Sequence, residues 1–216
     1  MIASRTFNID KDYCGVGCNI YKKNTITIKS GITILVGCNG IGKSTLIMQL
    51  KDQFDQDGTP YIHFDNLRDG GANARSTAGF RGDFDFLATA SFASEGENIF
   101  MNMNKFAGKI VNFVSTNKSD KGLWIFMDAV DSGYSVDNII DIKNFIKLIL
   151  KDFGMVNDIY FIISANEYEL ARNESCFDVY RGKYITFDSY DEYRGFIIKT
   201  REEKDKRKYK KRGGNK

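Results

Sequence analysis

Short apolar runs alternate with stretches of helical periodicity along most of this chain of 216 residues. Two runs, Ile32–Val36 and Leu123–Met127, are fully apolar, as expected of strands buried on both faces. Asp158–Ser164 has the same character after its first residue. Between the last two runs, apolar residues recur on one face of a predicted helix, at positions 139, 142, 146, 149 and 153. This alternation predicts an α/β fold whose mostly parallel sheet is flanked by helices on both faces.

Weaker patterns predict further elements. Asn24–Lys29 alternates Thr and Ile, which is typical of a half-buried strand and makes residues 1–36 a predicted β-rich N-terminus. We also expect helices over 45–54 and 97–114 and from residue 190, and strands at Tyr61–Phe64 and Lys183–Phe187. Residues 65–92 lack periodicity and are rich in Gly, Ala, Asn and Arg, which is typical of an inserted segment. Together with the helix beyond it, this stretch predicts a short helical subdomain over residues 65–122.

The segment Gly37–Thr45 (GCNGIGKST) fits the phosphate-binding pattern G-x-x-x-x-G-K-[ST] between a predicted strand and a predicted helix. Its glycines let backbone N–H groups wrap a polyphosphate, and the helix N-terminus adds its positive end. Lys43 is expected to reach the terminal phosphates and Ser44 to ligate Mg²⁺. The predicted nucleotide contacts here are Asn39, Gly40, Gly42, Lys43, Ser44 and Thr45. A glycine-rich turn before a helix is the plain alternative; we predict a site for a nucleoside triphosphate.

Asp128 follows directly after the apolar run Leu123–Met127. In phosphate-loop enzymes, an aspartate at the tip of such a strand completes the Mg²⁺ site, directly or through water. The alternative is an ordinary strand-end aspartate that caps the next turn. Beside a phosphate loop the first interpretation is favoured, so Ser44 and Asp128 are the predicted metal ligands.

Composition excludes several other kinds of chemistry. The single histidine, His63, rules out His-rich metal sites and catalytic triads. Cys14 and Cys18 form a C-x₃-C pair without a second Cys/His pair nearby, so reduced thiols are favoured over structural zinc. No uncharged stretch approaches the roughly 18 residues of a membrane span, and the first residues have no apolar signal core. We therefore expect a cytoplasmic protein with no membrane partner.

The net charge of +3 is unevenly distributed. Residues 199–216 hold ten Lys or Arg against three acids, so the rest of the chain carries a net charge of −4. The expected organisation is a single domain over 1–200 followed by a basic tail over 201–216. This tail is either a nucleic-acid contact, with Tyr209 available to stack on a base, or a solvated extension that aids solubility.

Four motifs appear in an order that resembles the ABC-type ATPases, the superfamily of transporter nucleotide domains and of SMC- and RecF-type heads. They are the Asn39-Gly40 step of the phosphate loop, Ala93–Glu97 as the signature, Asp128–Asp137 as the Walker B segment and D-loop, and Ser164–Asn166 at the switch position. Together they cover roughly residues 25–170. The resemblance implies a phosphate-loop NTPase fold of ABC type that binds ATP and Mg²⁺.

The same resemblance implies a homodimer that holds two ATP molecules at its interface. Ser94 and Gly96 of one protomer would then face the γ-phosphate held by the other, and Asn166 would line the site from the switch position. The alternative for the signature is a helix cap, in which Ser94 and Glu97 form a capping box. The two interpretations are compatible, because capping and phosphate capture use the same N–H groups.

The chain departs from the family pattern where water is activated. Ala129 stands where the family has a glutamate, Asn166 replaces the switch histidine, and no glutamine follows Tyr61–Phe64. Asp65 or Asn66 is the nearest replacement for that glutamine. Loss of a general base typically costs about 10²–10⁴-fold in rate.

Two rescues are available for the missing base. Asp131 lies three residues beyond Asp128, and Glu167 or Glu169 lies near the switch position. The expected enzyme is a slow ATP hydrolase with Lys43, Asp128 and Asp131 as catalytic residues. The alternative is a clamp that ATP closes and that hydrolyses it poorly.

The resemblance also suggests where adenine and a target would bind. The adenine usually stacks on an aromatic ahead of the phosphate loop, and Tyr13 and Tyr21 are both placed for this, although either is also explained by packing. In size and make-up the chain looks like free-standing ABC-type ATPases of bacteriophages that act on DNA or a protein complex, in the host cytoplasm. A transporter subunit is disfavoured because residues 65–92 are short and polar, and a kinase is disfavoured by the signature and D-loop.

Overall fold

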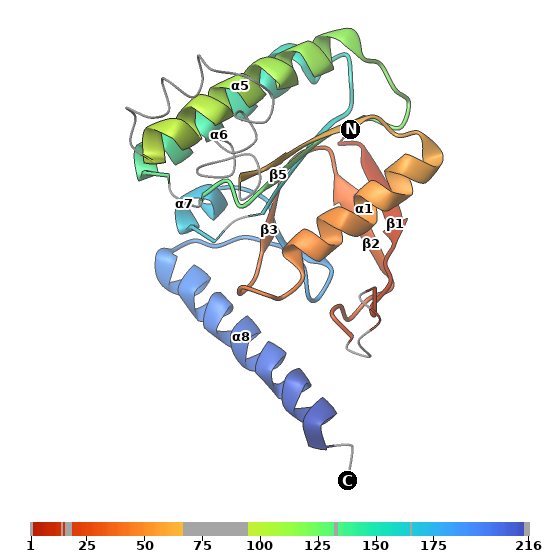
Figure 1. Ribbon diagram of the computed structural model, residues 1–216, viewed down its shortest axis with the longest axis vertical. Coiled ribbons are helices and arrows are strands. Elements are labelled where there is room, and N and C mark those ends of the chain that lie inside the picture. Colours follow the sequence, from red (N-terminus) through yellow and green to blue (C-terminus); the bar gives the residue numbers. More distant parts are fainter. Residues whose placement is uncertain are drawn as a thin grey trace, which may run out of the picture.

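The structure is a computed structural model that describes residues 2–13, 15, 19–66, 95–131, 134–164 and 166–213 (Figure 1). The elements in chain order are β1 (Ser4–Asn8), β2 (Thr25–Lys29), β3 (Gly31–Val36), α1 (Lys43–Asp57), β4 (Tyr61–Asp65), α5 (Glu95–Thr116), β5 (Leu123–Asp128), α6 (Val136–Phe153), β6 (Ile159–Ser164), α7 (Tyr168–Ala171), β7 (Cys176–Asp178), β8 (Lys183–Ile185) and α8 (Tyr190–Gly213). Every strand and helix predicted within these ranges is confirmed, with ends that differ by a few residues. Three short elements were not predicted: β1, α7 and β7.

The central sheet has six strands in the order β4-β5-β6-β3-β7-β8. Its first five strands are parallel, and only β8 pairs antiparallel. A separate antiparallel pair, β1 and β2, forms the β-rich N-terminus. In register, Leu35 of β3 lies opposite Ser164 of β6, and Met127 of β5 lies opposite Ile163. The carboxyl ends of β3, β5 and β6 therefore meet at one edge of the sheet, where ligands of open α/β sheets bind.

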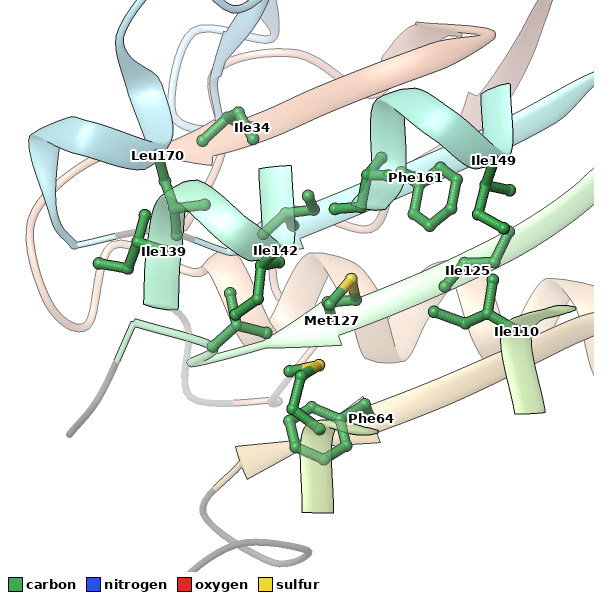
Figure 2. Packing of buried hydrophobic residues seen from close by; sticks show 14 of the residues in the cluster. Ile34, Phe64, Ile110, Ile125, Met127, Ile139, Ile142, Ile149, Phe161 and Leu170 are labelled. Carbon is green, nitrogen blue, oxygen red and sulfur yellow. The ribbon is translucent and has the colours of Figure 1, made fainter. Parts of the chain in front are cut away.

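The alternation of side chains along β5 divides the core between the two faces of the sheet. Ile125 and Met127 point to the face covered by α5 and α6, where Figure 2 shows them among Ile110 and Ile142. Trp124 and Phe126 point to the opposite face, which α1 and the β1–β2 pair cover (Figure 1). Both faces of the strand are buried, which explains why its sequence is apolar without interruption.

Helix α5 is the part of the predicted 65–122 subdomain that the structure describes in detail, since residues 67–94 lie outside the described residues. Its buried side chains Met103, Phe106 and Ile110 share one core with α6, and Phe106 stacks on Phe64 of β4. The described portion of the segment is thus packed into the main body of the protein. A separate helical subdomain stays a prediction.

Helix α8 runs from Tyr190 to Gly213 without a break at residue 200. The backbone of the predicted basic tail is therefore a continuation of this helix as far as the description reaches. Within the described ranges, no helix combines the length and the hydrophobicity needed to cross a membrane. Cys38 and Cys176 are buried free thiols, and burial raises the pKa of Cys176 to about 12; Cys14 and Cys18 lie outside the described residues.

Candidate phosphate-binding site

The phosphate loop connects the end of β3 to the start of α1 and depends on its glycines. Gly42 has a φ of 115°, and a Cβ there would lie 2.5 Å from Ile20 Cγ2 and 3.1 Å from a ring carbon of Tyr21. Only glycine satisfies both the backbone conformation and the space. No side chain caps α1 and its described first turn carries no acid, so its N–H groups face the loop as an anion site.

Tyr21 packs against this loop at Gly42. Its ring is buried, and its hydroxyl donates a 2.9 Å hydrogen bond to the Gly42 carbonyl. The packing interpretation of Tyr21 is therefore confirmed, because a ring in this position has no face open to a base. The Tyr13 hydroxyl donates a hydrogen bond to the carboxylate of Asp52 on α1. Stacking of adenine on Tyr13 stays a prediction.

Lys43 is the buried cation of the site. Its ammonium donates to the Gly37 carbonyl at 2.8 Å and to the Asn166 Oδ1 at 3.0 Å. Burial lowers the pKa of Lys43, and the nearby carboxylates of Asp131 and Asp128 act in the opposite direction. The ammonium thus joins the loop to the switch position, and it is held there by neutral acceptors that an anionic phosphate could replace.

Asp128 and Ser164 form a buried pair at the ends of the neighbouring strands β5 and β6. The Ser164 hydroxyl donates to the Asp128 Oδ1 and accepts the Ala129 N–H at 2.9 Å. Ala129 has a φ of 53°, a left-handed conformation that is unusual for a residue with a Cβ. The chain therefore turns sharply straight after the metal-ligand candidate.

Ser44 and Asp128 line one pocket of about 350 Å³ together with Lys43, Ala129 and Asn166. A hydroxyl and a carboxylate are the oxygen donors that Mg²⁺ takes at phosphate sites, where substrate oxygens and water fill its other positions. In the described part of the chain, no group of three His, Cys, Asp or Glu residues is arranged to hold a metal alone. The residues present fit a magnesium ion that arrives with a polyphosphate.

Replacing Ser164 with alanine is expected to destabilise the fold. The change leaves the buried Asp128 carboxylate without a donor and the Ala129 N–H without an acceptor. Each unsatisfied group costs about 1–3 kcal/mol, so we expect a loss of roughly 2–6 kcal/mol in the free energy of unfolding, measured by urea denaturation. Ser115→Ala is the matched control, because that hydroxyl bonds only an exposed carbonyl of its own helix. A Ser164→Ala protein as stable as the control would contradict the bridging role.

Asp131 holds the switch segment in place. Its Oδ2 accepts the N–H of Asn166 and, at 2.7 Å, the N–H of Glu167. The carbonyl of Asn166 in turn accepts the hydroxyl of Tyr193 at 2.8 Å. Asp131 is buried and is not among the residues that line the pocket, so action as a base would require it to leave both N–H groups. Its catalytic role stays a prediction.

The other replacements for the missing family residues are placed differently. Glu167 is exposed, and Glu169 lies 3.6 Å from Arg172, so neither lines the pocket. Asn66, one of the two candidates after β4, donates from its amide to the Ala129 carbonyl at 3.1 Å. Asp65 lies opposite Asp128 in the register of the sheet. Asn66 thus contacts the backbone of the site at Ala129.

Several predicted motif residues lie where the structure does not describe the chain, including Ser94, Ser132, Gly133 and Ala165. Gly96 is described, and it belongs to the first turn of α5, which begins at Glu95. The expectation that Glu95 and Gly96 precede the helix is therefore wrong, because the helix starts two residues earlier than its apolar stripe indicates. The trans role of Ser94 and Gly96 stays a prediction.

Sequence reasoning missed two site residues from the last helix. Thr200 Oγ1 accepts the Cys38 N–H at 3.0 Å, and the Lys204 ammonium donates to the Asn39 carbonyl at 2.6 Å. They lie one turn apart on α8 and bond consecutive residues of the phosphate loop. No signal in the sequence connects them to the loop, which is more than 160 positions away.

A scan against models of protein families found no match, and a search of curated proteins found none either. Solved structures do resemble the chain. A nucleotide-free ATP-binding cassette from an ABC transporter is 16% identical over 92% of this chain and 96% of its own, with a TM-score of 0.49. The cassette MJ1267 in its ADP conformation is 16% identical over 93% and 98%, with a TM-score of 0.48. Stu0660 of Streptococcus thermophilus is 10% identical over 88% and 77%, with a TM-score of 0.48.

Proposed function

We propose that this protein binds Mg-ATP in the pocket between the phosphate loop and the ends of β5 and β6, and that it hydrolyses ATP slowly. The observation that carries the proposal is the convergence of Lys43, Asp128 and Asn166 on the glycine loop in one pocket. A buried ammonium, an uncapped helix start and a carboxylate are arranged as a polyphosphate with a divalent cation requires.

Each residue of the pocket has a role in this proposal. The N–H groups of Gly42, Lys43 and Ser44 bind phosphate oxygens, and the Lys43 ammonium moves from the Gly37 and Asn166 oxygens to the terminal phosphates. Ser44 and Asp128 would hold a magnesium ion, which would neutralise negative charge on the phosphates. Asn166 polarises the terminal phosphate or orients water from the switch position.

Slow hydrolysis follows from Ala129, which offers no base. Asp131 is the nearest replacement in sequence, but its carboxylate is engaged with the N–H groups of Asn166 and Glu167. Positioning and electrostatic stabilisation still lower the barrier without an ideal base. The engagement of Asp131 favours a second candidate function, a nucleotide-gated clamp in which hydrolysis is negligible.

In the proposed active state, ATP joins two copies of the chain, with Ser94 and Gly96 of each completing the site of the other. This assignment is supported by α5, which is described from Glu95 onward, since N–H groups near the start of a helix attract anions. The closed dimer acts on DNA or on a protein complex, and residues 199–216 supply the positive charge for a nucleic-acid contact. An enzyme of DNA metabolism, of the kind that bacteriophages encode, fits this charge distribution.

Solution mass and phosphate release, measured together, test the proposal. With Mg-ATP we expect the mass to rise to twice the 24.5 kDa of one chain, and to fall back with ADP or after chelation of magnesium. Slow phosphate release would identify an ATPase. Faster release in the presence of DNA would support a nucleic-acid contact by residues 199–216. A stable dimer without release would identify the clamp. A chain that stays monomeric under all conditions would rule out the shared site.

A further inference from the structure

Helix α8 leaves the body of the protein by passing across the phosphate loop (Figure 1). Thr200, which is fully buried, fixes the crossing point through the Cys38 N–H. One turn later, the Lys204 ammonium lies 2.6 Å from the Asn39 carbonyl, and a Cβ on Gly40 would lie 3.7 Å from the same nitrogen. Asn39 and Gly40 both line the nucleotide pocket. A second ammonium is thus held beside two of the residues that line the pocket.

Two charged neighbours of Lys204 on α8, Glu203 and Arg207, are engaged in contacts away from the phosphate loop. Glu203 pairs with Arg181 at 2.5 Å. Arg207 donates to the carbonyls of Asn19 and Ile20 and lies 4.1 Å from the centre of the Tyr180 ring. Among the described residues, the Lys204 ammonium makes no ion pair and has a neutral carbonyl as its acceptor. A neutral acceptor is weaker than a charged phosphate, so the ammonium gains by exchanging one for the other.

We infer that Lys204 is a second phosphate-binding cation, supplied by the last helix of the same chain, and that it distinguishes ATP from ADP. This inference rests on the proposed function. When ATP is bound, the ammonium leaves the Asn39 carbonyl for the terminal phosphate beyond Gly40. When ADP is bound, no phosphate lies within its reach, and it keeps the contact with Asn39.

The electrostatics of the site agree with this exchange. The positive charge of Lys204 adds to the burial that lowers the pKa of Lys43, while Asp131 and Asp128 oppose them. Two ammonium groups beside one loop repel each other until an anion lies between them. A triphosphate brings more negative charge than a diphosphate, and its additional charge lies at the end of the chain of phosphates. The second cation therefore favours the triphosphate.

Nucleotide affinities of Lys204 variants test the inference by isothermal titration with Mg-ATP and with Mg-ADP. Lys204→Met removes the charge and keeps the stem, and we expect about a tenfold loss of ATP affinity with less than about a twofold change for ADP. Lys204→Gln keeps a donor for the Asn39 carbonyl without the charge, and it should show the same selective loss. Lys204→Arg keeps the charge and should preserve most of the preference for ATP. Lys206→Met, on an exposed position of the same helix, is the control that matches the change in net charge.

The ratio of the two affinities distinguishes phosphate contact from helix docking. Loss of ATP and ADP binding to the same extent would mean that Lys204 only docks α8 on the loop. An unchanged ratio in both the Met and the Gln variants would overturn the inference while leaving the proposed function in place. A wild-type protein that binds neither nucleotide would overturn the proposed function and this inference with it. Thermal melting of each variant identifies any that fails to fold. If one of the two uncharged variants fails, the ratio of ATP to ADP affinity in the other one tests the inference.

Discussion

Lys43→Met is expected to weaken Mg-ATP binding by about 10²-fold and to bring phosphate release below detection. The ammonium is the one cation buried inside the loop, and a charge-assisted bond to phosphate is worth roughly 1.5–3 kcal/mol, with more than one such bond available to it. Its loss also removes stabilisation of the charge that develops on the transferred phosphoryl group. Affinity is measured by isothermal titration and turnover by phosphate release.

The same substitution should leave the fold intact. Because burial lowers the pKa of Lys43, the charged form costs free energy in the folded protein at neutral pH, and that cost diminishes as pH rises toward the ordinary lysine value. Removing the charge relieves this cost and offsets the two hydrogen bonds that are lost. We expect the free energy of unfolding at pH 7 to stay within about 1 kcal/mol of wild type.

Lys51→Met is the control for Lys43→Met, because Lys51 lies on the same helix and bonds the ring of His63 away from the pocket. It should bind ATP as the wild type does. Wild-type affinity in the Lys43 variant would show that the pocket between β3, β5 and β6 is not the ATP site. Equal losses in both variants would point to damage to α1 instead of a lost phosphate contact.

The switch position joins three parts of the chain that are distant in sequence. Asn166 bonds Lys43 through its side chain, Asp131 through its N–H and Tyr193 through its carbonyl. Burial raises the pKa of Tyr193, so its hydroxyl remains a donor at neutral pH. A change in the position of Lys43 on nucleotide binding would therefore act on the segment after β5 and on α8 together.

Local patterns in the sequence were sufficient to predict that Lys43, Ser44, Asp128 and Asn166 lie together. The phosphate loop, Asp128 and the switch segment each follow an apolar strand, and the carboxyl ends of neighbouring parallel strands meet at one edge. The apolar run of β5 identified a strand buried on both faces because no polar residue interrupts it. The predictions that held were those in which spacing alone determines the neighbours.

Contacts between distant segments could not be predicted in this way. Strand β7 has three residues, too few for an alternating pattern, and it lies beside β3 through a long connection. The basic composition of residues 199–216 indicated a tail, whereas Thr200 and Lys204 bond the phosphate loop. The proximity of Asp131 to Asp128 in the sequence suggested a base, whereas in the structure the Asp131 carboxylate accepts the N–H groups of Asn166 and Glu167.

Ala129→Glu is expected to raise ATP turnover by tenfold or more. Position 129 lines the pocket and is held by the Ser164 hydroxyl at its N–H and by the Asn66 amide at its carbonyl. Its left-handed φ of 53° disfavours any residue with a Cβ, and alanine already bears that cost, so glutamate adds little strain to the backbone. A carboxylate placed there can accept a proton from the attacking water, a contribution typically of about 10²–10⁴-fold.

Ala129→Gln distinguishes the effect of a general base on turnover from the effect of side-chain size. Glutamine fills the same space as glutamate but does not accept the proton. Phosphate release at saturating Mg-ATP should rise in the glutamate variant and stay near wild type in the glutamine variant. That pair of results would mean that the native protein hydrolyses ATP slowly because position 129 offers no base, and that it therefore keeps ATP bound for longer. Equal turnover in all three proteins would mean that another group already supplies the base. Asp131 is then the residue to replace, because release of its two N–H partners is the rearrangement that would free its carboxylate.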